Sequence, residues 1–225
     1  MSSPHRSAAL CLALALGLLA GLSWWTAGFE VWTYEGQRQR QVETGELQAA
    51  TVALRGLDDR PVVLWGNGDA PAAYLVDFIY TRCPGVCRAL GGEFQRMQAE
   101  LAAAPGGRTE AVRLVSISFD VDHDDPSRLA RYAAAQQASD AHWIFAVPDS
   151  TRDARSLLRS LGVVVIADGA GGFAHNGSIH LLDARGRLRG LYRLDQWPQA
   201  LAAARRLAEP GSLASTSPRP ARVVQ

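Results

Sequence analysis

Apolar and polar positions follow one another in blocks whose period changes along the chain, and these blocks predict strands alternating with helices. Two runs, 73–80 (AYLVDFIY) and 112–119 (VRLVSISF), have the length and nearly unbroken apolarity of buried strands. Between them, apolar residues recur three or four positions apart, as on one face of a helix: Leu90, Phe94, Met97 and Leu101. We therefore expect a helix over residues 86–104.

The alternation continues as far as residue 208. An acidic turn at 120–125 leads into Pro126, a residue suited to the first turn of a helix. The further expected elements, in chain order, are that helix to about 137, a strand at 143–147, a helix at 152–161 capped by Ser150, a strand at 162–167, a hairpin of 178–182 and 188–193, and a helix at 195–208. A further hairpin is expected at 51–66, around Asp58-Asp59. This order predicts an α/β fold with a mixed central sheet and helices on its faces.

The N-terminal segment has a different pattern. Residues 8–27 carry no charge and are mostly apolar, and twenty such residues are long enough to span a bilayer core of roughly 30 Å. Trp24 and Trp25 stand at its distal end, where their rings suit the membrane interface. A cleaved signal peptide is the alternative, but no convincing small-x-small cleavage site lies near Ala27. With Arg6 before the span, the prediction is a single-pass anchor in the inner (cytoplasmic) membrane with the following domain in the periplasm.

These patterns divide the chain into four segments. We expect a membrane anchor or signal segment at 1–28, a polar juxtamembrane linker at 29–49, one folded domain at 50–208, and a disordered Ser/Pro-rich tail at 209–225. The formal net charge is +1, with acids and bases interspersed. Because no basic stripe stands out, the composition argues against a nucleic-acid partner.

The cysteines carry the most specific chemistry. Cys11 lies inside the apolar span, which leaves Cys83 and Cys87 in the domain, at the end of a buried strand and the start of a helix. If helical geometry begins near Pro84, their Cα atoms lie about 6 Å apart. That separation suits a disulfide, and it also suits two sulfurs on one soft metal ion. The helix N-terminus, together with Arg82 and Arg88, favours the thiolate forms.

A third, neutral ligand would complete a trigonal copper(I) site, and imidazole is the common choice. His175 stands out because it follows the glycine-rich stretch 169–172, so we expect it on a mobile turn that swings towards the cysteines. His180 alternates with apolar neighbours in a strand and is expected to have a structural role. His123 and His142 have no evident partner in the sequence.

Three segments together resemble the SCO/SenC family. They are the strand–Cys83-Pro-Gly-Val-Cys87–helix unit, the acidic turn from Ser118 to Pro126, and His175 followed by a hairpin with Asp183-Ala-Arg-Gly. The resemblance covers about 51–208. Members of that family are membrane-anchored copper chaperones with a thioredoxin-like fold, and they help to build the CuA site of cytochrome c oxidase.

The resemblance implies that Cys83, Cys87 and His175 bind copper(I), with copper(II) as a second form. It implies an oxidase subunit carrying the CuA site as partner, besides other periplasmic copper carriers or thioredoxin-like reductants. Asp122 and Asp124 become candidates for a supporting role in the acidic turn.

The sequence also departs from the family pattern. Arg88 stands where a proline often follows the second cysteine, and Val121 stands where the acidic turn commonly has a proline. Ala174 and Asn176 flank His175 where the family usually has Asp and Ser. Loss of an acid beside a ligating histidine changes what orients its ring, so we expect copper affinity or partner choice to differ from the family norm.

Other functions remain open at this point. Cys83 and Cys87 also suit a thiol–disulfide oxidoreductase that reduces the cysteines of an oxidase subunit, a reaction that does not require His175. A peroxidase and a zinc site are weaker alternatives, the latter because a closed zinc site needs four ligands. We expect a metal-binding protein rather than a conventional enzyme.

Overall fold

The computed structural model describes residues 4–25, 38, 40–42, 44–66, 71–83, 86–103, 111–169, 171–175 and 177–209; within 4–7 and 86–90 it describes the backbone alone. The chain divides into two compact units, Met1–Thr44 and Gly45–Gln225. The predicted tail lies outside the described residues apart from Glu209, as does the first part of the predicted linker.

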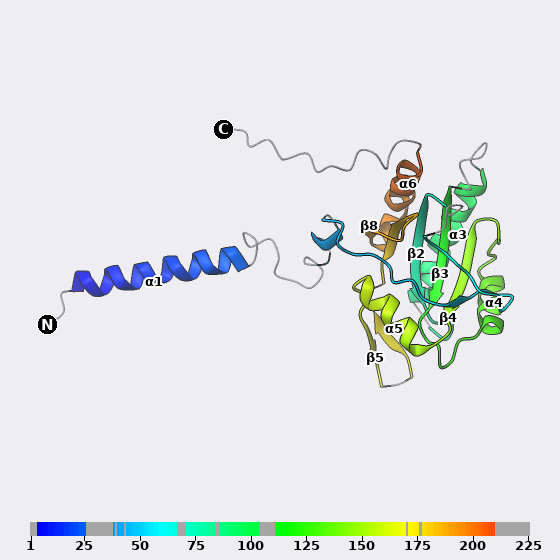
Figure 1. The fold of residues 1–225 in the computed structure, drawn as a ribbon, viewed down its shortest axis with the longest axis horizontal. Helices are drawn as coiled ribbons and strands as arrows, with labels where there is room; N and C mark the ends of the chain where they lie inside the picture. The colour runs from blue at the N-terminus through cyan, green and yellow to red at the C-terminus, as the bar shows by residue number, and fades with distance from the viewer. Residues whose placement is uncertain are drawn as a thin grey trace. The chain divides into compact units, whose positions relative to one another are not determined.

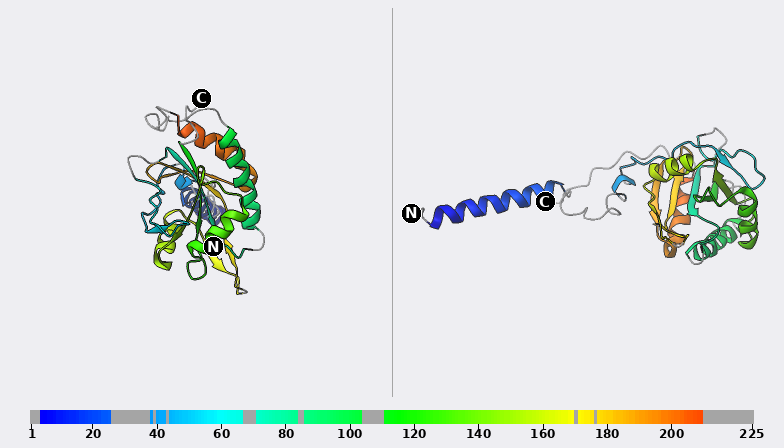
Figure 2. Two further views of the ribbon diagram at one scale, coloured as in Figure 1. Left: turned by 90° about the vertical axis from the view of Figure 1, so that its right-hand side faces the viewer. Right: turned by 90° about the horizontal axis from the view of Figure 1, so that it is seen from below.

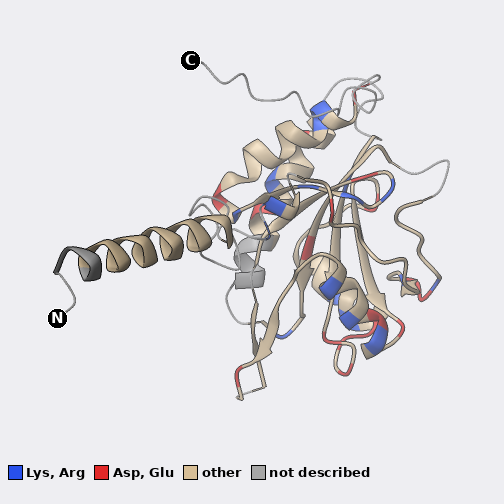
Figure 3. Cartoon of the chain, turned by 60° about the vertical axis from the view of Figure 1, so that its left-hand side comes forward, with Lys and Arg blue, Asp and Glu red and all other residues tan. Residues whose placement is uncertain are grey.

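The N-terminal unit contains helix α1 (Pro4–Trp25). Its segment Ala8–Trp25 has a mean hydropathy of 1.9 and buries none of its residues within the structure. Beyond its first turn, Figure 3 shows this helix without a Lys, Arg, Asp or Glu. By length and composition α1 can cross a membrane, although a signal sequence would meet the same criteria.

The second unit is built on a six-stranded mixed sheet in the order β1-β4-β3-β2-β7-β8 (Figure 1). Its strands are β1 (Leu54–Arg55), β2 (Ala73–Ile79), β3 (Val112–Ser118), β4 (Trp143–Pro148), β7 (Ile179–Asp183) and β8 (Leu188–Tyr192). The central strands β2, β3 and β4 are parallel, while β1, β7 and β8 each run antiparallel to their neighbours. The three parallel strands therefore end at the same edge of the sheet.

Helices cover both faces of this sheet. They are α3 (Val86–Ala103), α4 (Pro126–Ala135), α5 (Thr151–Ser160) and α6 (Trp197–Leu207), the last preceded by the short 3-10 helix η1 (Leu194–Gln196). Figure 2 shows α3 and α6 along one side of the sheet and α5 along the other. This two-sided cover explains why β2 and β7 are buried at every position, and why β2 is an almost unbroken apolar run in the sequence.

Two helix starts follow directly from side-chain capping. The Asp125 carboxylate accepts a hydrogen bond from the backbone N–H of Arg128, and Pro126 occupies the first helical position of α4. Ser150 accepts one from the N–H of Asp153 at the start of α5. Both starts agree with the sequence predictions.

Two predicted elements differ from the structure. The hairpin expected at 51–66 is present but short: its arms meet at one antiparallel bridge, Arg55 opposite Pro61, with hydrogen bonds from Val62 N–H to Leu54 C=O and from Gly56 N–H to Arg60 C=O. Its first arm, β1, also pairs with the edge of the main sheet at β4. The strand expected at 162–167 begins only at Val165, as β5 (Val165–Ala167). It pairs with β6 (Phe173–His175) in a separate two-stranded sheet. Both differences arise because pairing partners far along the chain decide where short strands form.

Candidate metal centre

The candidate site begins where β2 ends, in the segment Tyr80–Cys83 that leads towards α3. The backbone N–H of Cys83 donates to the carbonyl of Tyr80, at 3.2 Å, and the Cys83 side chain is half-buried. Cys87 is the second residue of α3, but its side chain lies outside the described residues, as do Pro84 and Gly85. The backbone of both cysteines thus lies at the carboxyl end of a central parallel strand, as predicted.

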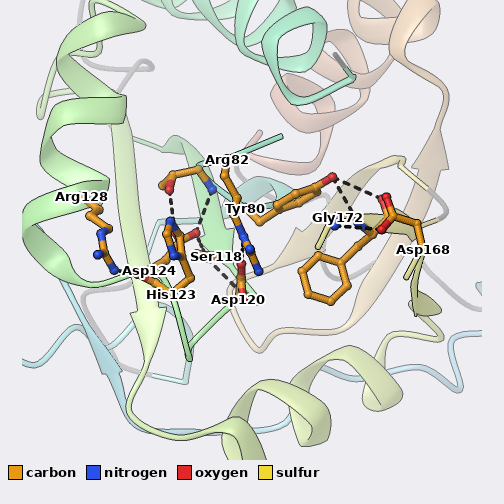
Figure 4. Close-up of polar contacts among 11 residues, drawn as sticks. Tyr80, Arg82, Ser118, Asp120, His123, Asp124, Arg128, Asp168 and Gly172 are labelled. Carbon is orange, nitrogen blue, oxygen red and sulfur yellow. Dashed lines mark hydrogen bonds and ion pairs between the residues drawn. The ribbon is translucent and has the colours of Figure 1, made fainter. Parts of the chain in front are cut away.

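A buried carboxylate anchors this segment. Asp124, in the acidic turn, is only 2% exposed. It accepts hydrogen bonds from Thr81 N at 2.8 Å, from Thr81 Oγ1 at 2.5 Å and from Ser118 Oγ at 2.6 Å. Figure 4 shows Asp124 beside Ser118, within the network of polar contacts that surrounds this segment. Because Thr81 lies two residues before Cys83, Asp124 has the supporting role that the sequence suggested for it.

Asp122 behaves differently from Asp124, although it lies in the same turn. It is exposed, and it accepts a hydrogen bond of 3.3 Å from the hydroxyl of Thr151 at the start of α5. This hydrogen bond joins Asp122 to α5 and not to the cysteine segment.

Arg82, next to Cys83, forms an ion pair with another residue of the acidic turn. Its Nε lies 2.9 Å from the carboxylate of Asp120, which is 6% exposed (Figure 4). The same guanidinium lies 5.9 Å from the centre of the Phe173 ring. The sequence suggested that Arg82 adds positive charge near the thiols. This suggestion needs correction, because Asp120 neutralises much of that charge.

His175 lies on β6, opposite Val165, and not on the mobile turn that the sequence suggested. Its ring packs against Phe119, with centroids 5.3 Å apart, and against Tyr80, at 6.5 Å. Phe119 directly follows β3, and Tyr80 directly follows β2. The histidine is therefore held at the edge of the sheet where the segment with Cys83 begins.

The imidazole of His175 has one unused ring nitrogen and is kept neutral by burial. Within the part of the chain that the structure describes, its buried Nδ1 has no hydrogen-bond partner. Burial lowers the pKa of His175 below its ordinary value of 6.5, so the ring is neutral at pH 7. A neutral imidazole with an unused ring nitrogen is the form that binds a metal ion.

An aromatic cluster that the sequence did not single out holds β6 in place. Tyr80, Phe119 and Phe173 contact one another with centroids 5.2 to 5.4 Å apart. The Tyr80 hydroxyl also lies 3.4 Å from the carbonyl and 3.3 Å from the backbone nitrogen of Phe173. The sequence did contain a sign of this cluster, because an aromatic residue directly follows each of the two buried strands.

The other histidines of the domain have different positions. His180, on β7, is buried; its Nδ1 lies 3.3 Å from the carbonyl of Val76, and its ring packs edge-on against Phe78. This confirms the structural role predicted for it. His142 precedes β4 and therefore lies at the opposite end of the parallel strands from Cys83. The topology removes His142 from the candidate site.

Comparison with known proteins agrees with this arrangement. The family model described as SCO1/SenC matches residues 70–208. The SCO1 protein homolog of Bacillus subtilis (strain 168) is 27% identical over 117 residues, which are 51% of this chain and 58% of that protein. The matched segment thus covers little more than half the length of that relative.

Solved structures share the fold at low sequence identity. A structure of BsSco, described as a member of the Sco family, has a TM-score of 0.61 at 21% identity and covers 72% of this chain and 94% of its own. Bradyrhizobium japonicum ScoI has a TM-score of 0.57 at 23% identity, with 71% and 99% covered. These similarities confirm the predicted thioredoxin-like α/β fold. Because the family model matches more than half of the chain, including Cys83, Cys87 and His175, the protein belongs to the SCO1/SenC family.

Proposed function

We propose that this protein is a membrane-tethered copper(I) chaperone that helps to assemble the CuA centre of cytochrome c oxidase. Its copper ligands are Cys83, Cys87 and His175. Family membership supports this proposal, and ScoI of Bradyrhizobium japonicum was solved with copper bound. BsSco is described as belonging to a family of cytochrome c oxidase assembly proteins.

The observation that carries the proposal is the state of His175. A buried imidazole nitrogen without a described partner costs free energy unless a ligand uses it. The ring is kept neutral by burial and fixed by aromatic contacts with Tyr80 and Phe119. Two cysteine thiolates and one neutral imidazole form a soft, three-ligand set that suits copper(I).

The supporting residues keep the cysteine segment in one conformation. Asp124 holds Thr81 through two hydrogen bonds, and Asp120 holds Arg82 through an ion pair. A metal site whose ligands are held in place before binding loses less conformational entropy when the ion arrives. Copper is here the cargo, which an oxidase subunit receives.

In this proposal α1 is the membrane tether, and the domain works in the periplasm at the surface of the inner membrane. An uncharged segment such as Ala8–Trp25 supports anchoring through its length and hydropathy. A chaperone confined to that surface meets a membrane-bound oxidase at raised effective concentration.

A second candidate is a thiol–disulfide oxidoreductase that reduces the cysteines of the oxidase subunit through Cys83 and Cys87. The observation in its favour is that a disulfide switch is described for BsSco. The two functions share the cysteines, and they differ in their need for His175.

The deciding experiment measures copper(I) binding by the reduced full chain in detergent, against a competing chelator. We compare the wild type with His175→Ala and with His142→Ala. His142 is a matched control, because it is also half-buried and its Nδ1 also lacks a partner among the described residues. We expect one copper(I) per chain and a loss of more than about 100-fold in affinity in His175→Ala alone, beyond the roughly 10–100-fold effects of groups that only orient a ligand.

If the affinity is the same in all three proteins while the Cys83–Cys87 disulfide exchanges readily with thiols, copper delivery is refuted. The oxidoreductase then becomes the function that the site supports.

A further inference from the structure

Helix α5 carries positive charges that the fold itself does not use. Arg152, Arg155 and Arg159 are spaced three and four residues apart, so they form a row along one side of the helix (Figure 3). All three are exposed, and within the part of the chain that the structure describes their guanidinium groups form no hydrogen bond or ion pair. Arg193 and Arg205, by contrast, each pair with a carboxylate although they are exposed too.

This arginine row weakens the helix that carries it. Like charges three or four residues apart repel each other. Arg152 is also the second residue of α5, where the helix dipole is positive and disfavours a cation. Asp153, the acid of the same turn, accepts a hydrogen bond of 2.6 Å from the hydroxyl of Ser150 instead of pairing with the row. Since no carboxylate of the described chain balances the row, its presence points to an anionic group from outside the chain.

A cavity of about 420 Å³ lies beside the arginine row, between α5, the acidic turn and the two-stranded sheet of β5 and β6. Arg155 and Arg159 line it together with the apolar side chains of Leu158, Phe119 and Phe173. Its volume falls within the range of about 300–1,000 Å³ that is typical of ligand pockets. Charged and apolar groups thus stand next to each other, which suits an occupant with a carboxylate beside an apolar side chain.

The acids at the cavity do not cancel the charge of the arginine row. Asp120 is 6% exposed and forms its ion pair with Arg82, at 2.9 Å. Asp122 is exposed, and its hydrogen bond comes from the hydroxyl of Thr151. Among the described residues, neither carboxylate forms an ion pair with the row. The border of the cavity on α5 therefore stays positive and attracts carboxylates.

The cavity adjoins the candidate metal centre. Phe119, which lines the cavity, packs against the ring of His175 with centroids 5.3 Å apart. Phe173, which also lines it, lies two residues before His175 on β6. A partner seated in the cavity therefore contacts the same phenyl ring as the imidazole that we assign to copper.

We propose that the arginine row and this cavity form a docking surface for an acidic protein partner. Carboxylates of the partner pair with Arg155 and Arg159, and an apolar side chain next to them enters the cavity. A bilayer surface presents phosphates but no side chain that fills a cavity, and three charges on one short helix are too few for a nucleic-acid strand. The inference rests on the proposed function and deepens it, because the partner is then the oxidase subunit that receives copper.

The test measures how the copper-free full chain, in nanodiscs of phosphatidylcholine, binds the copper-free soluble CuA domain of the oxidase subunit from the same organism. Calorimetry gives the Kd at about 50 mM and about 500 mM NaCl. The variants are the double substitution Arg155→Gln with Arg159→Gln, and Ala167→Trp, which fills the cavity from its exposed position on β5. Arg131→Gln on α4 is the matched control, because Arg131 is exposed and also forms no ion pair among the described residues.

We expect the double arginine variant to raise the Kd about tenfold at the lower salt concentration and less than about threefold at the higher one, where salt screens the ion pairs. Ala167→Trp should raise it about tenfold at both concentrations, because it acts through packing. Arg131→Gln keeps the wild-type Kd. A wild-type Kd in the double variant, or no association of the wild type, overturns the proposal.

An anionic membrane is the rival partner for the arginine row. The modification of Arg155 and Arg159 by phenylglyoxal, followed by mass spectrometry without the CuA domain, should proceed equally fast in nanodiscs of phosphatidylcholine and in nanodiscs that also contain phosphatidylglycerol. A rate that the anionic lipid lowers about tenfold at these two residues, and not at Arg131, would assign the row to the membrane and overturn the proposal.

Copper(I) affinity separates this inference from the proposed function. None of the variants changes a proposed copper ligand, so each should bind copper(I) as the wild type does. If copper(I) binding depends on His175 while association ignores Arg155 and Arg159, the docking surface is refuted and the chaperone stands. If association depends on the two arginines while the chain does not bind copper(I), the docking surface stands and the chaperone is refuted.

Discussion

The carboxylate of Asp124 provides the sharpest test of how the site is held together. Replacing it in Asp124→Ala removes the acceptor of three hydrogen bonds, from Thr81 N, Thr81 Oγ1 and Ser118 Oγ. The Thr81 backbone N–H then loses its partner in a part-buried position. The two hydroxyls can rotate towards other acceptors, but the backbone N–H cannot.

The magnitude follows from these three contacts. Hydrogen bonds to a charged group contribute about 1.5–3 kcal/mol each. Because the two hydroxyls can find other acceptors, most of the cost comes from the one bond that the Thr81 N–H cannot replace. We expect Asp124→Ala to lower the free energy of unfolding by about 3 kcal/mol. Asp124→Asn keeps the shape and one acceptor oxygen, so its loss is about half as large.

The assay is urea denaturation of the full chain in detergent, followed by tryptophan fluorescence. With a slope of about 2 kcal/mol/M, the midpoint of Asp124→Ala falls by about 1.5 M. Asp122→Ala is the control, because that exposed acid of the same turn accepts one long hydrogen bond, and its loss changes stability by less than about 0.5 kcal/mol. Equal midpoints for the two alanine variants would refute the view that Asp124 anchors the cysteine segment.

Three further predictions concern ionisable groups. Because burial raises the pKa of Asp77, the folded chain keeps a proton that the unfolded chain releases between pH 3.8 and about 7, and wild-type stability falls over that range by roughly 4 kcal/mol. Urea denaturation at pH 4, 6 and 8 should show this fall in the wild type and not in Asp77→Asn. An equal fall in the variant contradicts the prediction. Arg82→Gln leaves Asp120 buried without its ion pair. Because Arg82 is 41% exposed and solvent screens the pair, we expect the free energy of unfolding to fall by only about 1 kcal/mol. A fall as large as that of Asp124→Ala would contradict the view that solvent screens this ion pair. The ring of His175 should titrate below pH 6.5 in an NMR titration of the metal-free chain, and a midpoint above that value would show that it is not desolvated.

The fold could be predicted where a signal is local and long. β2 and β3 are seven-residue strands covered on both sides, and the apolar residues of α3 repeat over about three turns. Asp125 and Ser150 mark helix starts through hydrogen bonds that span only three residues. These features need no knowledge of the tertiary structure.

The site could be predicted less completely, because its contacts join distant segments. β6 has three residues, too few for a periodic pattern, and it is held by the aromatic rings of Tyr80 and Phe119. The partner of Arg82 lies 38 residues away, so the sequence gave no sign that its charge is neutralised. Asp77 did have a signal, since it is an acidic residue in the middle of an apolar strand, but the shift of its pKa depends on the elements that bury it.

The geometry of β6 also predicts how the replacement of the usual Asp by Ala174 affects His175. Ala174 replaces the usual Asp beside His175, and a missing acid suggested a change in how the imidazole is oriented. In the structure, Ala174 is exposed and stands opposite Ile166, while His175 stands opposite Val165. Neighbouring residues of a strand point to opposite faces, so an acid at position 174 projects away from the imidazole. We therefore expect Ala174→Asp to change copper(I) affinity by less than about threefold and to leave the pKa of His175 below 6.5. An increase of tenfold or more would show that residue 174 turns towards the histidine when copper is bound, and that β6 does not hold its conformation.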